Sequence, residues 1–320
     1  MHRSGTSTVA RAVNLLGAYL GESKDLGTAN EDNPEGYWER PDITSLNDRL
    51  LRALGRRWDS VAPVPAEWRE SFVVGPFRKE IMDLIRSRLA GQPLWAWKDP
   101  RTCLVFSLWR DVLNQLGVDL CSVFVVRSPL DVANSLKRRD GMRLGQAFGL
   151  WFNYNLSALQ ASRALPITFL SYDRLLESWE PELRRCANAL KIPWPGDEQS
   201  LDKAMNSFIR PKLRHSQTTL DDLREAPGPV QELYGVLLEV LKAPSTVPER
   251  FFEVIDRLSR DFQGYSSFFE GGLDNAAIPQ AARPHYLQRT WWRWKRSIRK
   301  RLGPAKGPID PKPAASFGAK

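Results

Sequence analysis

Hydrophobic residues fall along the chain in patterns that predict a mixture of strands and helices. Residues 120–126 are rich in β-branched residues and apolar on both faces, which is typical of a strand buried in a parallel sheet. Residues 166–171 predict a second strand, and residues 94–97 predict a shorter buried one. Helices are predicted over residues 7–20, 42–54, 77–90, 102–116, 129–139, 143–164, 179–190, 198–207, 229–242 and 247–263.

The order of these elements predicts an α/β fold. Strands alternate with helices as far as residue 171, which implies a parallel sheet flanked by helices. Only helices are predicted after that point, so the C-terminal region is expected to be helical. Ligands of such sheets bind at the carboxyl ends of the strands, and we expect the functional residues there. Residues 1–265 are interpreted as one domain.

The positive charge of the chain is concentrated near its C-terminal end. The net charge is +9 over 320 residues, which at first suggests a nucleic-acid-binding protein. However, residues 283–320 hold 11 Lys/Arg and one acid, whereas the rest of the chain holds 35 Lys/Arg and 36 acids. Because the body is nearly neutral, we expect no nucleic-acid partner.

The basic segment contains a predicted amphipathic helix over residues 287–302. Its apolar stripe consists of Leu287, Trp291, Trp294, Ile298 and Leu302. A basic helix with tryptophans is typical of peripheral contact with an anionic membrane. The alternative is a helix docked on the body with its basic face in solvent. Residues 266–286 are interpreted as a linker and residues 303–320 as a disordered tail.

The cysteine content and the apolar runs indicate a cytoplasmic protein. Three widely spaced cysteines argue against a disulfide framework, and Cys103 and Cys121 lie in apolar runs typical of a core. No stretch approaches the roughly 18 apolar residues of a membrane span. The N-terminus has no apolar signal segment.

The first candidate site is the polar segment Arg3-Ser4-Gly5-Thr6-Ser7-Thr8, which leads into a predicted helix. A helix N-terminus offers free N–H groups and the positive end of a dipole, and Gly5 lets the backbone approach an anion. Arg3 adds charge, and the hydroxyls add donors. The Walker spacing of a magnesium nucleotide site is missing, so a metal-free anion is favoured. An ordinary Ser/Thr helix cap is an equally good interpretation of this segment alone.

The second candidate site joins Arg127, at the end of a predicted strand, to the helix that follows it. Ser135 and Arg139 lie four residues apart and share one face of that helix. Two cations and a hydroxyl that converge suit a phosphate monoester. The alternative is an arginine that caps a carbonyl, with two solvated helix residues beside it.

Two further segments carry charge next to aromatic residues. Lys98 lies in a Lys-Asp-Pro-Arg run at the end of the 94–97 segment, where a surface Lys–Asp pair is the ordinary interpretation. Glu39 lies in a loop between aromatic and basic residues, which could desolvate it and raise its pKa toward that of a general base. Four tryptophans, at positions 38, 95, 97 and 151, are candidates for a sugar platform, although core packing is the commoner role.

Together these motifs resemble those of sulfotransferases that use 3′-phosphoadenosine 5′-phosphosulfate (PAPS). The likeness is to the bacterial branch that begins with a His-Arg-Ser-Gly-Thr-Ser run, which is related to tyrosylprotein and carbohydrate sulfotransferases. The segments that carry it are His2–Ser7, Val125–Pro129 with Ser135, and Trp97–Pro100. The likeness extends over roughly residues 1–220 and implies a P-loop-like sheet.

The resemblance implies a role for each motif residue. The 5′-phosphosulfate would be held by Arg3, Ser4, Gly5, Thr6, Ser7 and Thr8. The 3′-phosphate would be held by Arg127 and Ser135 with help from Arg139, and Tyr172 would lie near the nucleotide. Lys98 and Arg3 would stabilise charge on the transferring group, with no metal. Glu39 would be the base on the acceptor hydroxyl, and Asp99 and His2 are rivals for that role.

The chain departs from the family at its beginning. A buried strand normally precedes the phosphosulfate loop, whereas here only Met1 and His2 precede Arg3. We therefore expect the first strand of the sheet to be missing. Its absence would leave neighbouring strand edges unpaired and lower the stability of the chain.

The sequence thus favours a sulfotransferase that moves a sulfuryl group from PAPS to a hydroxyl, most simply on a glycan. An ATP-dependent P-loop kinase is the second hypothesis, and the missing Walker spacing argues against it. A non-catalytic module that binds a nucleotide or an anionic surface is the third.

Overall fold

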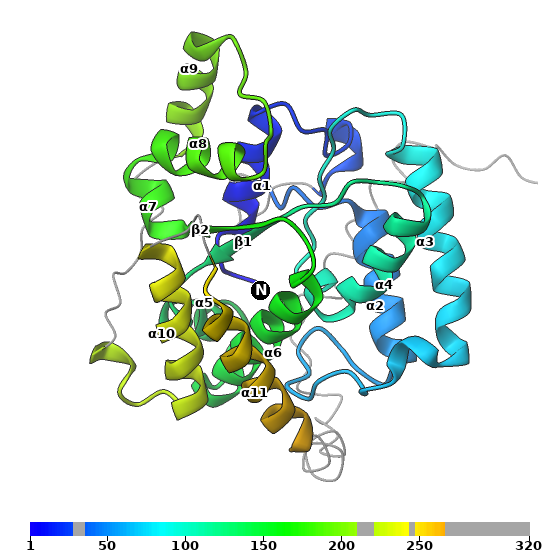
Figure 1. Ribbon diagram of the computed structural model, residues 1–320, viewed down its shortest axis with the longest axis vertical. Helices are drawn as coiled ribbons and strands as arrows, with labels where there is room; N and C mark the ends of the chain where they lie inside the picture. Colours follow the sequence, from blue (N-terminus) through cyan, green and yellow to red (C-terminus); the bar gives the residue numbers. More distant parts are fainter. Residues whose placement is uncertain (28–35, 210–220, 243–246, 266–320) are drawn as a thin grey trace, which may run out of the picture. The chain divides into compact units, whose positions relative to one another are not determined.

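A computed structural model of the chain describes residues 1–27, 36–209, 221–242 and 247–265 (Figure 1). The chain divides into two units, Met1–Glu270 and Gly271–Lys320. Every described residue belongs to the first unit, whereas the predicted linker, basic helix and tail lie outside the described residues. The described part is mixed α/β, mostly helical, around a small parallel sheet.

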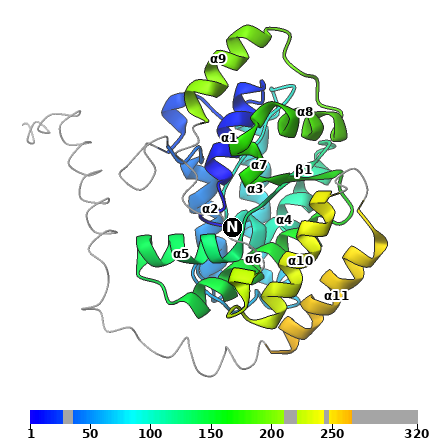
Figure 2. The same ribbon diagram turned by 90° about the vertical axis from the view of Figure 1, so that its left-hand side faces the viewer.

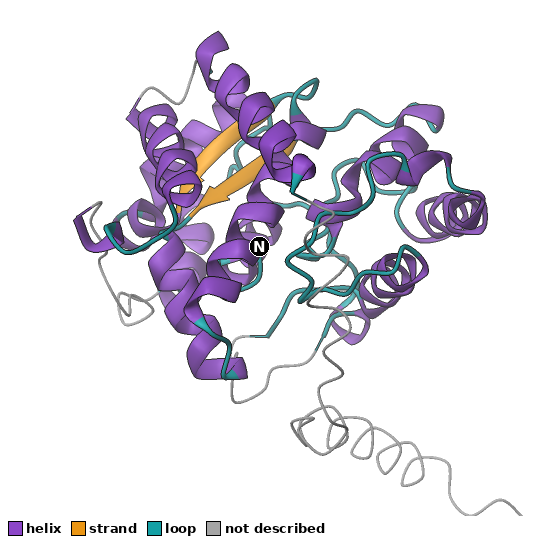
Figure 3. Cartoon of the chain, turned by 90° about the horizontal axis from the view of Figure 1, so that it is seen from below, coloured by secondary structure: helices purple, strands orange, loops and turns teal. Residues whose placement is uncertain are grey.

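Two of the three predicted strands form this sheet. The strands β1 (Ser122–Val126) and β2 (Ile167–Ser171) pair in parallel, with Val126 opposite Ser171 at their carboxyl ends. Figure 3 shows them side by side among helices. The prediction of a strand over residues 94–97 was wrong, because this segment meets a partner only at the isolated bridge between Tyr19 and Trp95. A single bridged residue pair is too short to make this segment a β-strand.

Ten of the eleven α-helices that the structure describes correspond to predicted ones. Their bounds are α1 (Thr6–Leu15), α2 (Pro41–Ala53), α3 (Gly75–Arg88), α4 (Thr102–Gln115), α5 (Pro129–Asp140), α6 (Leu144–Ser162), α8 (Trp179–Ala189), α9 (Glu198–Phe208), α10 (Gly228–Lys242) and α11 (Glu249–Gly264). The helix α7 (Tyr172–Glu177) was not predicted. Short 3-10 turns lie at Ser23–Asp25, Trp68–Glu70, Phe72–Val74 and Asp221–Leu223.

The helix α1 is shorter than predicted. It ends at Leu15 rather than at residue 20, and Gly17 follows with a φ of 100°. This left-handed conformation favours glycine and stops the helix there. The chain then runs extended through Tyr19, whose backbone bonds Leu94 and Ala96.

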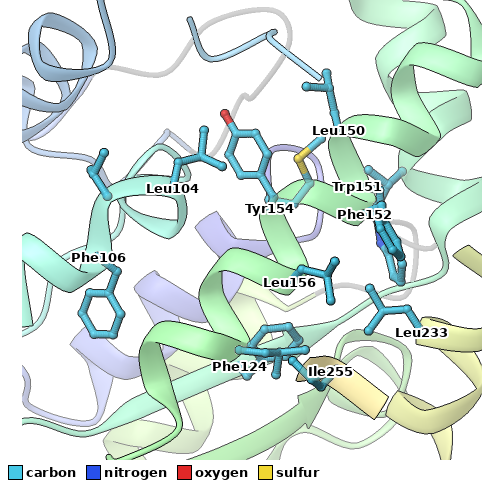
Figure 4. Packing of buried hydrophobic residues seen from close by; sticks show 14 of the residues in the cluster. Leu104, Phe106, Phe124, Leu150, Trp151, Phe152, Tyr154, Leu156, Leu233 and Ile255 are labelled. Atoms are coloured by element: carbon cyan, nitrogen blue, oxygen red, sulfur yellow. The ribbon is translucent and has the colours of Figure 1, made fainter. Parts of the chain in front are cut away.

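The sheet separates two hydrophobic clusters, because alternate residues of a strand face opposite sides. Phe124 and Phe169 face the larger cluster, whereas Val125 and Leu170 face the smaller one. The larger cluster surrounds α6, which packs against α4, α5, α10 and α11. In Figure 4 the buried side chains of α6, from Leu150 to Leu156, lie between those of α4 and the α10 and α11 pair.

The smaller cluster lies beneath α1, α8 and α9. Val9 of α1 and Leu183 of α8 are buried in it together with Met205 of α9. Figures 1 and 2 both show α9 and α8 beside α1. This cluster fixes α1, and therefore the polar segment that precedes it, against the sheet.

A cavity of about 190 Å³ lies on the side of β1 that faces away from β2. The N–H of Ser122 bonds Pro166 on the β2 side, so the backbone of Val123 and Val125 points the other way, toward the cavity. Trp97 and Lys98 also line this cavity. In the described part of the chain β1 has a single strand neighbour, β2. A P-loop-like fold is not established by this small sheet.

Candidate functional site

The carboxyl ends of the two strands bring Arg127 and Tyr172 together. Each is the residue directly after its strand, and the strands end in register. The guanidinium carbon of Arg127 lies 4.6 Å from the centroid of the Tyr172 ring. A cation over an aromatic face is attracted by the ring electrons, so the ring holds the guanidinium in place. The predicted position of both residues at one sheet edge is thus observed.

The N-terminus of α1 lies on the same tyrosine. Gly5 is the residue before the helix and has a φ of 79°, in the left-handed region. A Cβ atom at this position would lie 2.1 Å from Cε2 of Tyr172, so only glycine fits between the helix and the ring. Gly5 has no side chain and no side-chain hydrogen bond caps the helix. The alternative interpretation of this segment as an ordinary Ser/Thr cap is therefore not what the structure shows.

Arg3 and Ser135 are in direct contact. The Nε of Arg3 donates a hydrogen bond of 2.8 Å to Oγ of Ser135, which is buried on α5. The Nη1 of Arg127 donates one of 2.8 Å to the backbone oxygen of Arg3. The side chain of Arg3 therefore lies with the residues predicted for the 3′-phosphate, so it joins the two predicted phosphate sites.

Arg127 carries a charge that is not matched by a carboxylate. Its Nε is buried without a hydrogen-bond partner, and no acid among the described residues pairs with it. A buried polar group without a partner costs roughly 1–3 kcal/mol, and more when it is charged. A bound anion would supply the missing acceptor.

The remaining residues of the polar segment lie at the start of α1. Ser4 is buried, and Thr6, Ser7 and Thr8 form the first turn. Thr6 lines the same cavity as Lys98. The helix N-terminus and Lys98 thus border one space.

Lys98 and Glu39 form a largely buried ion pair. The Nζ of Lys98 lies 2.5 Å from Oε1 of Glu39 and 3.0 Å from the backbone oxygen of Tyr37. The side chains of Lys98 and Glu39 are only 12% and 16% exposed. The sequence predicted an aromatic environment for Glu39, but its closest charged neighbour is this lysine. One oxygen of the Glu39 carboxylate is therefore engaged by Lys98.

The loop that carries Glu39 is strained beside α1. Trp38 has a φ of 53°, in the left-handed region that a bulky residue rarely adopts. The guanidinium of Arg11, on α1, lies 4.5 Å from the centroid of its ring. The loop is thereby attached to the same helix that begins after the polar segment Arg3–Gly5.

Asp99 and His2, the two alternatives to Glu39 as the base, lie in positions that are less favourable for that role. The side chain of Asp99 is fully buried and accepts hydrogen bonds from Asn47 and Arg101. The ring of His2 contacts Trp58 and Tyr154 at centroid distances of 5.0 and 5.8 Å. Burial, and secondly nearby arginines, lower the pKa of His2 well below its ordinary value, so its ring is neutral.

Arg139 is not joined to the Arg3 and Ser135 contact by any hydrogen bond. It lies at the end of α5, where it pairs with Asp140 at 2.7 Å and lies over Trp58. Its contacts with Asp140 involve Nε and Nη2.

The tryptophans offered as a sugar platform are mostly structural. Trp151 is buried, and Trp97 stacks on Trp109 with ring centroids 5.4 Å apart. Trp95 packs against Trp97 in turn. Of the four, Trp38 alone adjoins Glu39 in the sequence.

The described residues contain no group of three His, Cys, Asp or Glu side chains that could hold a metal ion. No helix among them combines the length and apolar character needed to cross a bilayer. The cysteines are all free, and Cys121 is exposed rather than buried in the core as predicted, because it precedes β1.

Sequence reasoning missed the polar residues that surround Lys98. Asn47 lies inside α2 and is fully buried, where it bonds Asp99, Thr102 and Trp109. An asparagine on the apolar stripe of a predicted helix was the available signal, because buried amides need partners.

Comparison with protein-family models, with curated proteins and with solved structures found no match to this chain.

Proposed function

We propose that the chain is a PAPS-dependent sulfotransferase that acts on an acceptor hydroxyl. The observation that carries the proposal is the contact of Arg3 with both Ser135 and Arg127, across 132 and 124 residues of sequence. Two cations, a hydroxyl and an uncapped helix N-terminus meet at one sheet edge. This is the donor set expected for a ligand with two separate anionic groups.

The residues present fit such a donor. Arg127 and Ser135 would hold the 3′-phosphate, with Arg3 between them and the 5′-phosphosulfate. The N-terminus of α1, from Gly5 to Thr8, would receive the phosphosulfate. The buried Nε of Arg127, which has no partner, supports an anionic ligand at this position.

Bound PAPS would supply an activated sulfuryl group, and the chain would supply position and charge. Transfer of such a group resembles phosphoryl transfer, in which the protein mostly orients the reactants and neutralises charge. Lys98 borders the same cavity as Thr6 and can provide this charge. Glu39, released from Lys98, would accept the proton of the acceptor hydroxyl.

Ligand-dependent unfolding tests the proposal. Adenosine 3′,5′-bisphosphate should raise the melting temperature of the wild-type protein, whereas ATP with magnesium should not. The Arg127→Ala variant should lose at least about tenfold in affinity for the bisphosphate, since one charged hydrogen bond is worth roughly 1.5–3 kcal/mol. Selective stabilisation by ATP with magnesium would favour a kinase, and no response to either would favour a non-catalytic module.

Transfer of labelled sulfate from PAPS then tests the chemistry. We expect Lys98→Ala to lower kcat far more than it weakens binding of the bisphosphate, because the charge on Lys98 matters most during transfer. A near-normal kcat in this variant would remove Lys98 from the mechanism. Glycans are our proposed acceptor class, and a parallel screen of peptides and lipids compares them directly.

A further inference from the structure

A buried polar network connects the segment of Glu39 to the segment of Lys98. Its centre is Asn47, two turns into the helix α2 that begins just after Glu39. The side chains of Asn47 and Asp99 are both fully buried. The Nδ2 of Asn47 donates a hydrogen bond of 2.9 Å to Oδ2 of Asp99, the neighbour of Lys98.

Each polar atom of the Asn47 amide has a partner, which fixes its orientation. Nδ2 donates a second bond of 2.9 Å to Oγ1 of Thr102, and Oδ1 accepts one of 2.8 Å from Nε1 of Trp109. A 180° rotation of the amide would bring Oδ1 next to the Asp99 carboxylate, so that two acceptors would face each other. It would also bring Nδ2 next to Nε1 of Trp109, so that two donors would face each other. The network therefore has one arrangement, and a fully satisfied buried network is rigid.

Asp99 is held from its other side by the turn that contains Lys98. Its Oδ1 accepts hydrogen bonds from the backbone N–H of Arg101 at 3.2 Å and from Nη1 of Arg101 at 2.8 Å. Arg101 also lies 3.6 Å from Asp48, the residue after Asn47. Two successive residues of α2 are thus attached to two residues of the Lys98 turn.

We propose that Asn47 is a positioning residue for the Lys98–Glu39 pair. Glu39 precedes α2, and Lys98 precedes Asp99, so the bond between Asn47 and Asp99 sets how the two segments lie against each other. Its importance for transfer rests on the proposed function, whereas its effect on Lys98 does not. Asn47 itself touches neither Lys98 nor Glu39 by a hydrogen bond.

Chemical labelling of Lys98 tests the inference without any activity. Acetic anhydride should modify Lys98 slowly in the wild-type protein, because its side chain is 12% exposed and ion-paired. In Asn47→Ala and in Asn47→Ser we expect the labelling rate of Lys98 to rise at least about threefold, relative to the exposed Lys79 in the same sample. Peptide mass spectrometry measures both rates below the melting temperature of each variant.

A matched control is available on α9. Asn206 accepts a hydrogen bond of 2.9 Å from the indole of Trp179, the same kind of bond that Asn47 accepts from Trp109. Asn206→Ala should leave the labelling rate of Lys98 within about 1.5-fold of wild type. An unchanged rate in the Asn47 variant that folds, or an equal rise in Asn206→Ala, would overturn the inference.

Turnover then separates this inference from the proposed function. In an active protein, Asn47→Ser should lower kcat about tenfold while the Kd for adenosine 3′,5′-bisphosphate stays within twofold. A parallel loss of bisphosphate affinity would contradict a positioning role confined to Lys98 and Glu39. If the wild-type protein transfers no sulfate, the proposed function fails, and the labelling result alone decides the role of Asn47.

Discussion

The Nε of Arg3 donates a hydrogen bond of 2.8 Å to Oγ of Ser135. This contact attaches the polar segment before α1 to the helix α5, which follows β1. Arg3 belongs to the predicted 5′-phosphosulfate site, and Ser135 belongs to the predicted 3′-phosphate site. The two predicted sites therefore lie next to each other.

The Ser135→Ala variant should bind adenosine 3′,5′-bisphosphate about tenfold more weakly, as measured by isothermal titration calorimetry. The hydroxyl would be lost both as a ligand and as the partner that orients Arg3, and bonds to charged groups are worth roughly 1.5–3 kcal/mol. Ser87→Ala is the control, since that hydroxyl bonds only the backbone of its own helix. Affinities of Ser135→Ala and wild type within twofold of each other would contradict a role of Ser135 in binding.

Gly5→Ala should be more destabilising than Gly55→Ala, although both glycines have a positive φ. The φ values are 79° and 69°, so both substitutions carry the left-handed cost of roughly 1–2 kcal/mol. At Gly5 the added Cβ also meets Tyr172 at 2.1 Å, whereas nothing lies within 4 Å of one at Gly55. We expect a further loss of about 1–3 kcal/mol at Gly5 from overpacking. Urea unfolding measures the difference, and equal losses would mean that Tyr172 is free to move.

His2→Phe should make stability less dependent on pH. Burial lowers the pKa of His2 in the folded state. Below about pH 6.5 the unfolded state therefore binds more protons than the folded state, and stability decreases as the pH is lowered. The aromatic neighbours of the ring are Trp58 and Tyr154, and four cationic groups disfavour its protonation further: Arg101, Arg139, the N-terminal ammonium group and Lys98.

Urea unfolding of both proteins between pH 7.5 and 5.0 tests this. The wild type should lose up to about 1.4 kcal/mol per pH unit below pH 6.5 that His2→Phe retains. Phenylalanine keeps the edge contacts with Trp58 and Tyr154. Parallel curves for the two proteins would show that His2 becomes protonated in the folded state.

Ala158→Leu should stabilise the protein by filling the cavity beside β1. Asn155, Ala158 and Ser162 of α6 form one wall of this cavity. Filling a cavity commonly raises the free energy of unfolding by about 0.5–2 kcal/mol. We expect a gain of about 1 kcal/mol for this variant, as measured by thermal unfolding. Ala53→Leu, at an exposed position near the end of α2, should change stability by less than about 0.5 kcal/mol. A lower stability of Ala158→Leu would mean that the cavity walls cannot accommodate three more carbon atoms.

Much of the fold could be predicted from the sequence, because its signals are local. The β-branched run before Arg127 and the proline after Ser128 predicted β1 and the start of α5 correctly. The parallel pairing then placed Arg127 and Tyr172 at one edge, as expected for two strands that are connected by helices. That Arg3 contacts both Ser135 and Arg127 is an observation of the structure, whereas their binding of an anion stays a prediction.

The remaining features depend on contacts between distant segments. No periodicity reports that Lys98 pairs with Glu39, since the two residues belong to separate loops. The 94–97 segment has the composition of a strand, but strand formation needs a neighbour, and Tyr19 offers only one paired position. Arg139 shares a helix with Ser135, yet the adjacent Asp140 competes for its charge.

The long separation between Arg3 and its two partners has a consequence for folding. Contacts across 124 and 132 residues are expected to form late, because closing long loops costs conformational entropy. The helices and the two strands can form from contacts much closer in sequence. In a refolding experiment, the proposed binding of adenosine 3′,5′-bisphosphate should therefore return after the helical signal, so that binding would report the finished structure and not a collapsed intermediate.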